Sequence, residues 1–77
     1  LLRANIARAQ LELVHRFVAA RTNRPAEAWV GERIGGAGAE LDTVVAELER
    51  EVWGGSGTPL PRERILAAAD AAIGGGL

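Results

Sequence analysis

Apolar residues recur every three or four positions over residues 1–21, which predicts one long amphipathic helix. They form two rows rather than one. The first row is Leu2, Ile6, Ala9, Leu13, Phe17 and Ala20, and the second is Ala4, Ala7, Leu11, Val14 and Val18. A helix with two apolar rows needs two neighbours to cover them. The turn-forming residues Thr22, Asn23 and Arg24, followed by Pro25, end this helix.

Two further helices are predicted over residues 25–34 and 39–53. Pro25 suits a first helical position and Glu27 suits a first turn, although Gly31 costs the shorter helix about 1 kcal/mol relative to alanine. The longer helix has the clearest single face in the chain. That face consists of Leu41, Val44, Val45, Leu48 and Val52.

The last part of the chain predicts a loop, a helix and a terminator. Glycines and prolines indicate a flexible loop at 54–60. Pro61 then begins a helix over 61–73, whose apolar face is Ile65, Leu66, Ala69, Ala72 and Ile73, and residues 74–77 form its terminator or a linker. We therefore expect an all-α fold, a single small bundle of about four helices over residues 1–77 with no sheet.

Charge and apolar pattern predict how the helices pack. The first helix is mainly basic and the helix at 39–53 is mainly acidic, which favours packing them together. In this arrangement one row of the first helix, Leu2, Ile6, Leu13 and Phe17, meets Leu41, Val45, Leu48 and Val52. The other row, Leu11, Val14 and Val18, is left for the fourth helix or for a partner. These three residues are the predicted interaction surface.

Composition also favours association. Apolar residues make up 48% of the 77 positions, but fifteen of them are alanine, so the core is thin. Domains of this size bury only about 60% of their unfolded surface and gain roughly 3–5 kcal/mol from one core. Because the chain has no cysteine, no disulfide reinforces it. We expect a homo-oligomer or a protein partner, and the start at Leu1 suggests a piece of a larger protein.

Charge and the short apolar stretches argue against nucleic acid and membranes as partners. The formal net charge is −1 and all nine basic residues are arginine, spread around the first helix rather than gathered in a stripe, so nucleic-acid binding is not predicted. Charged residues and glycines interrupt every apolar stretch, so no membrane insertion of this segment is expected. A cytoplasmic location is favoured.

The candidate chemical groups do not form a catalytic set. His15 is the only histidine, which leaves a structural role or a pH-sensitive contact. Nothing around Ser56 resembles a nucleophile elbow, and the glycine clusters have neither the lysine of a phosphate-binding loop nor a preceding strand. Glu47 and Glu51 are expected to face water. We therefore predict no enzyme activity, no cofactor and no metal.

The two tryptophans are the most informative large side chains. Trp29 is expected in the core. Trp53 is the last residue of the helix at 39–53 and precedes a loop, so it suits either the core or the surface, where tryptophan is a frequent anchor of protein interfaces. Trp53 therefore joins the candidate interaction residues.

Two local resemblances supply the alternative functions. Residues 62–77, which run Arg-Glu-Arg-Ile-Leu-Ala-Ala-Ala-Asp and onward to Gly-Gly-Gly-Leu, resemble the first helix of TetR-type repressors. This resemblance implies an accessory domain of a DNA-binding regulator. Residues 41–73, with Val-Trp-Gly-Gly at 52–55, are similar to helical tails of bacterial BatD-type membrane proteins. The residues themselves favour a non-enzymatic helical module for protein interaction or oligomerisation.

Overall fold

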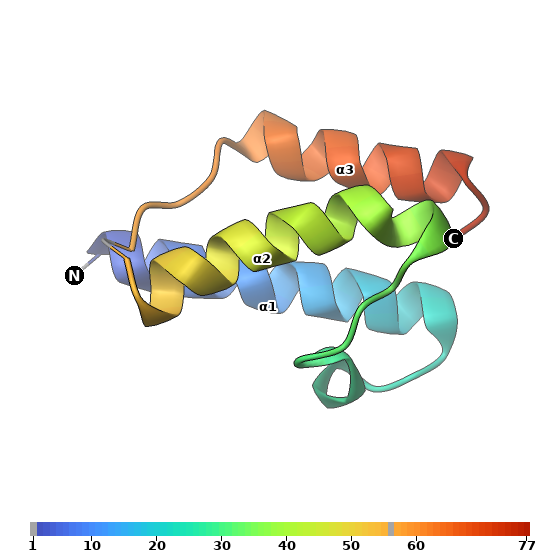
Figure 1. Cartoon of the computed structure of the whole chain (residues 1–77), viewed down its shortest axis with the longest axis horizontal. Helices are drawn as coiled ribbons and strands as arrows, with labels where there is room; N and C mark the ends of the chain where they lie inside the picture. Colours follow the sequence, from blue (N-terminus) through green and yellow to red (C-terminus); the bar gives the residue numbers. More distant parts are fainter. Residues whose placement is uncertain (1, 56) are drawn as a thin grey trace.

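Three α-helices and two short 3-10 turns make up the fold in a computed structural model, which describes residues 2–55 and 57–77 without the side chains of residues 2–5 (Figure 1). The elements are α1 (Leu2–Thr22), the turns η1 (Ala26–Trp29) and η2 (Gly36–Gly38), α2 (Ala39–Trp53) and α3 (Arg62–Gly74). No strand occurs within the described ranges. The all-helical class is confirmed, but the helices number three rather than four.

The predicted helix over 25–34 is wrong. Only the four residues of η1 are helical there, because Val30 is extended and Gly31 has a φ of 79°, a conformation that no helix contains. Residues 32–35, which lead to η2 and the start of α2, then have no regular secondary structure. The Asp42 carboxylate accepts hydrogen bonds from the backbone N–H groups of Ile34 and Gly35, both at 2.8 Å. A side chain of α2 thus replaces the helical hydrogen bonds of this segment.

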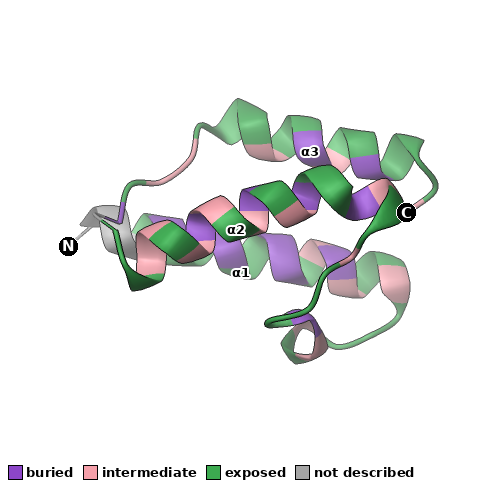
Figure 2. Ribbon diagram, viewed as in Figure 1, coloured by how far each residue is buried: buried purple, intermediate pink, exposed green. Residues whose placement is uncertain are grey.

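The middle helix organises the arrangement. α2 packs against α1 on one side and α3 on the other, whereas α1 and α3 are not a closely packed pair. α1 and α3 run in the same direction, opposite to α2, in a molecule whose Cα extents are 36 × 24 × 16 Å (Figure 1). One small core joins the three helices and η1 (Figure 2). It contains Ala7, Leu11, Val14, Val18, Trp29, Leu41, Val44, Leu48, Ala68 and Ala72.

The C-terminal residues close α3 with a Schellman motif. The N–H of Leu77 donates to the carbonyl of Ala72 at 2.9 Å, and that of Gly76 to Ile73 at 3.0 Å. Gly76 has a φ of 104°, which the motif requires of its glycine. The Leu77 side chain packs on the core, and its carbonyl accepts a hydrogen bond from Arg21 Nε at 3.3 Å. The end of α3 is thereby tied to the end of α1.

The predicted partition of α1 is reversed. Leu11, Val14 and Val18 are 7%, 2% and 1% exposed, so the row that was left for the fourth helix or for a partner lies in the core. Ile6 and Leu13, which were assigned to the interior, are 48% and 62% exposed. The buried row is covered from two sides, since α2 packs along it and η1 also packs on α1. The side chain of Leu2 lies outside the described part of the chain.

Candidate interaction surface

Four aliphatic side chains on two helices are about half exposed. On α1, Ile6 and Leu13 are 48% and 62% exposed, and on α3, Leu66 and Ile73 are 54% and 44% exposed. Each pair is separated by seven residues. Residues at that spacing lie two turns apart on one face of a helix, as in the contact row of a coiled coil.

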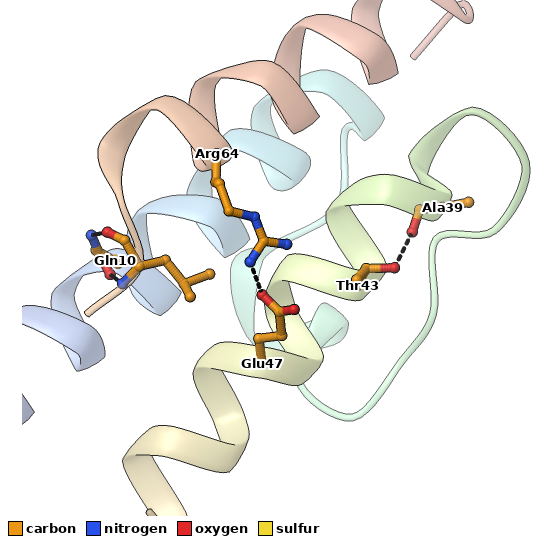
Figure 3. A network of polar contacts seen from close by, with 6 residues as sticks. Gln10, Ala39, Thr43, Glu47 and Arg64 are labelled. Carbon is orange, nitrogen blue, oxygen red and sulfur yellow. Dashed lines mark hydrogen bonds and ion pairs between the residues drawn. The ribbon is translucent and has the colours of Figure 1, made fainter. Parts of the chain in front are cut away.

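Contacts with residues just before and just after α3 show which flank of α1 faces α3. Gln10 Nε2 donates to the carbonyl of Leu60 at 2.9 Å, and the N–H of Leu60 donates to Gln10 Oε1 at 3.0 Å, just before α3 begins (Figure 3). Arg21 bonds the carbonyl of Leu77 just after α3 ends. The flank of α1 that carries Gln10 and Arg21 is therefore the α3 side.

Ile6 and Leu13 lie beside this flank of α1. Gln10 is four residues after Ile6 and three before Leu13, so the three side chains are neighbours on the helix surface. Phe17, seven residues after Gln10, is half-buried and packs against the core at the same flank. The exposed row of α1 thus continues outward from the side that meets α3.

The exposed row of α3 lies on the flank turned toward α1. Arg64 forms an ion pair with Glu47 of α2, which marks the opposite flank (Figure 3). Residues two positions apart in a helix differ by about 200° in direction, so Leu66 points away from Arg64. Ile73, two turns after Leu66, points in nearly the same direction as Leu66. We call Ile6, Leu13, Leu66 and Ile73 together the α1–α3 face.

Trp53 belongs to a different surface. Its side chain is 71% exposed, and the guanidinium carbon of Arg8 lies 5.6 Å from the centre of its ring. Arg8 is two residues from Ile6 and so points to the far side of α1. Of the candidate interaction residues, Trp53 is exposed, whereas Leu11, Val14 and Val18 are buried.

Trp29 lies in the core, as predicted, and closes the η1 side of α1. Its indole Nε1 donates to Thr22 Oγ1 at 3.1 Å, and that hydroxyl donates to the carbonyl of Val18 at 2.7 Å. The Arg24 guanidinium carbon lies 4.3 Å from the ring centre, within cation–π range. The polar tip of the indole is therefore satisfied and its ring is covered.

His15 is buried beside Trp29. Its Nε2 has no hydrogen-bond partner, and a void of about 10 Å³ adjoins it, lined in part by Glu32 and Asp42. Among residues 2–55 and 57–77, no group of three or more metal-ligating side chains is placed to hold a metal. Ser56, the one candidate nucleophile, lies outside the described residues.

Two acidic residues of α2 that were expected to face water make contacts within the domain. Glu47 pairs with Arg64, and Glu51 Oε1 accepts the N–H of Thr58 at 3.1 Å. A shallow groove of about 600 Å³ also runs along α2, and both Glu49 and Arg50 line it. The charged residues that line it are Glu32, Arg33, Asp42, Glu47, Glu49 and Arg50.

Comparison of the chain with protein-family models, with curated proteins and with solved structures finds no match. Within residues 2–55 and 57–77, no helix is long and apolar enough to cross a membrane. The α1–α3 face is the feature that sequence reasoning missed. The signal in the sequence that could have identified this face is the seven-residue spacing of Ile6 and Leu13, and of Leu66 and Ile73.

Proposed function

We propose that this chain is a non-enzymatic protein-interaction module that binds an amphipathic helix on its α1–α3 face. The observation that carries the proposal is the half-exposure of four aliphatic side chains at seven-residue spacing on neighbouring flanks of two helices. Helix-in-groove recognition uses anchors at this kind of spacing.

The helix arrangement supports a helical occupant. In an antiparallel four-helix bundle, the first and third helices run in the same direction and each packs against the second and fourth. α1, α2 and α3 occupy three such positions, because α2 packs against both of the others while α1 and α3 are not closely packed. A further helix, antiparallel to α1 and α3, fits the fourth position.

The rim of the face carries charges of both signs. Exposed Arg16 lies three residues after Leu13, and exposed Asp70 lies four residues after Leu66. In the isolated chain, Arg16 approaches Glu12 at 3.9 Å between side chains that are 70% and 68% exposed. Such an ion pair holds Arg16 only weakly. Arg16 and Asp70 are therefore available to polar groups of an incoming helix.

Methyl nuclear magnetic resonance tests the proposal without knowledge of the natural partner. A synthetic amphipathic helix with leucines at heptad spacing is titrated into the labelled chain. We expect the methyl signals of Ile6, Leu13, Leu66 and Ile73 to shift together, and that of Val30, which is 64% exposed elsewhere, to stay in place. Shifts confined to other methyls, or none at millimolar peptide, would contradict the proposal.

A matched pair of variants then checks the location. Leu66→Lys with Ile73→Lys places two charges on the face, and Val30→Lys places one at a comparably exposed site away from it. The double variant should lose the peptide response while remaining helical by circular dichroism, and Val30→Lys should keep it. An equal loss in both would show that peptide binding does not use the face.

A further inference from the structure

We infer that a second copy of this chain occupies the α1–α3 face, with its α1 lying antiparallel to this α1 across a two-fold axis at Leu13. The inference rests on the proposed function and names the partner. Its starting point is the symmetry of side-chain size about Leu13, on the exposed flank of α1.

Large and small side chains on this flank alternate so that they fit a reversed copy. Ile6 and Ala20 are each seven residues from Leu13, and Ala9 and Phe17 are each four residues from it. In an antiparallel pair centred on Leu13, Ile6 meets the second copy's Ala20, and Phe17 meets its Ala9. Each bulky side chain faces a small one, which is the condition for close helix packing.

α3 adds to the same contact. The bonds Gln10–Leu60 and Arg21–Leu77 align the two helices, which run in the same direction, and place Leu66 nearly level with Leu13 (Figure 1). The two-fold axis therefore brings Leu13 and Leu66 of both copies together at its centre. An apolar cluster at the middle of a contact is the usual location of its strongest contributions.

The single chain exposes more surface than a typical folded monomer of its mass. Its accessible surface is 4936 Å² for 8.1 kDa. A folded monomer of that mass is expected to expose about 4500 Å². The four aliphatic side chains of the face contribute to this surplus, and a second copy would cover them.

Disulfide trapping tests the register, because the chain has no cysteine of its own. A disulfide needs Cα atoms within about 7 Å of each other. Leu13→Cys lies at the proposed axis and should form a disulfide dimer at least ten times faster than Val30→Cys, an equally exposed control. A mixture of Ile6→Cys and Ala20→Cys should cross-link between the two variants much faster than either does with itself.

Each outcome separates the inference from the proposed function. If Leu13→Cys cross-links no faster than Val30→Cys while the peptide titration still shifts the face, the second copy is excluded and the interaction module stands. If Ile6→Cys cross-links with itself as fast as with Ala20→Cys, the antiparallel register is wrong. If the peptide also fails to shift the face, both proposals fall. Circular dichroism of the reduced variants verifies that each one is folded.

Discussion

Neighbouring residues in α1 should respond in opposite ways to the same substitution. Leu13 is 62% exposed and Val14 is 2% exposed, although both are aliphatic and stand side by side in the sequence. Leu13→Glu and Val14→Glu introduce the same carboxylate on either side of the boundary between surface and core. The comparison tests the reversed partition of α1 without reference to any partner.

The magnitudes follow from burial. At Leu13 the new carboxylate remains in water, and substitutions at such sites change the free energy of unfolding by no more than about 0.5 kcal/mol. At Val14 it must be buried without a partner, which costs several kcal/mol. Since a domain of this size has only about 3–5 kcal/mol to lose, Val14→Glu should be largely unfolded. For the same reason, Leu11→Glu combined with Val18→Glu should unfold the chain rather than only separate it from a partner.

Urea unfolding followed by far-ultraviolet circular dichroism measures both effects. A protein concentration of about 0.1 µM, below the dissociation constant predicted for self-association, keeps association from contributing to stability. We expect the Leu13→Glu curve to overlay that of the parent chain and Val14→Glu to show little helix before urea is added. A folded Val14→Glu, or an unfolded Leu13→Glu, would refute the assignment of the two rows of α1.

Three further predictions concern contacts inside the domain. Asp42→Ala removes the acceptor of both the Ile34 and Gly35 N–H groups and should lower the free energy of unfolding by about 2 kcal/mol in urea titrations; an unchanged midpoint would show that the carboxylate does not hold this segment. His15→Leu removes a buried, unpaired Nε2 and should raise the free energy of unfolding by about 1 kcal/mol, so a lower melting temperature would contradict it. Gly76→Ala, at a φ of 104°, should lower the free energy of unfolding by about 1 kcal/mol. Gly74 is helical and has nothing within 4 Å of an added Cβ, so Gly74→Ala should raise the free energy of unfolding by about 0.5–1 kcal/mol. Calorimetry that finds the same sign for both substitutions would be incompatible with the Schellman motif.

Sequence periodicity predicted the elements with a single apolar face or a clear proline start. The helix at 39–53 has the predicted bounds, and α1 and α3 differ from their predicted bounds by one residue. Local signals were sufficient here because apolar spacing and helix-terminating residues agree with each other. Their agreement leaves little for tertiary contacts to override.

The segment 25–34 shows where local signals fail. Pro25 and Glu27 correctly indicate a helical start, but η1 ends at Trp29. The hydrogen bonds that the N–H groups of Ile34 and Gly35 donate to Asp42, and the positive φ of Gly31, favour a non-helical path instead. A side-chain contact of this kind has no periodic signature in the sequence.

The location of the candidate site depends on which of the two apolar rows of α1 is buried, and the sequence pattern of α1 does not encode this. Its two apolar rows are similar in sequence, and the structure selects the row containing Ala7, Leu11 and Val18 because both α2 and η1 pack on α1. Burial of Trp29 at the η1 side fixes that choice. Which row stays exposed thus follows from the packing of η1 against α1, and η1 is an element that was predicted with the wrong length.

Sedimentation equilibrium of the parent chain tests the central proposal most directly. Each copy brings four aliphatic side chains that are about half exposed, the equivalent of about two complete side chains. Burying them in two copies is worth roughly 6–12 kcal/mol, of which association consumes a large part. We predict a reversible monomer–dimer equilibrium with a Kd between about 1 µM and 1 mM, shifted to monomer by Leu13→Glu. A single species of monomer mass at every concentration up to several millimolar would contradict self-association on this face.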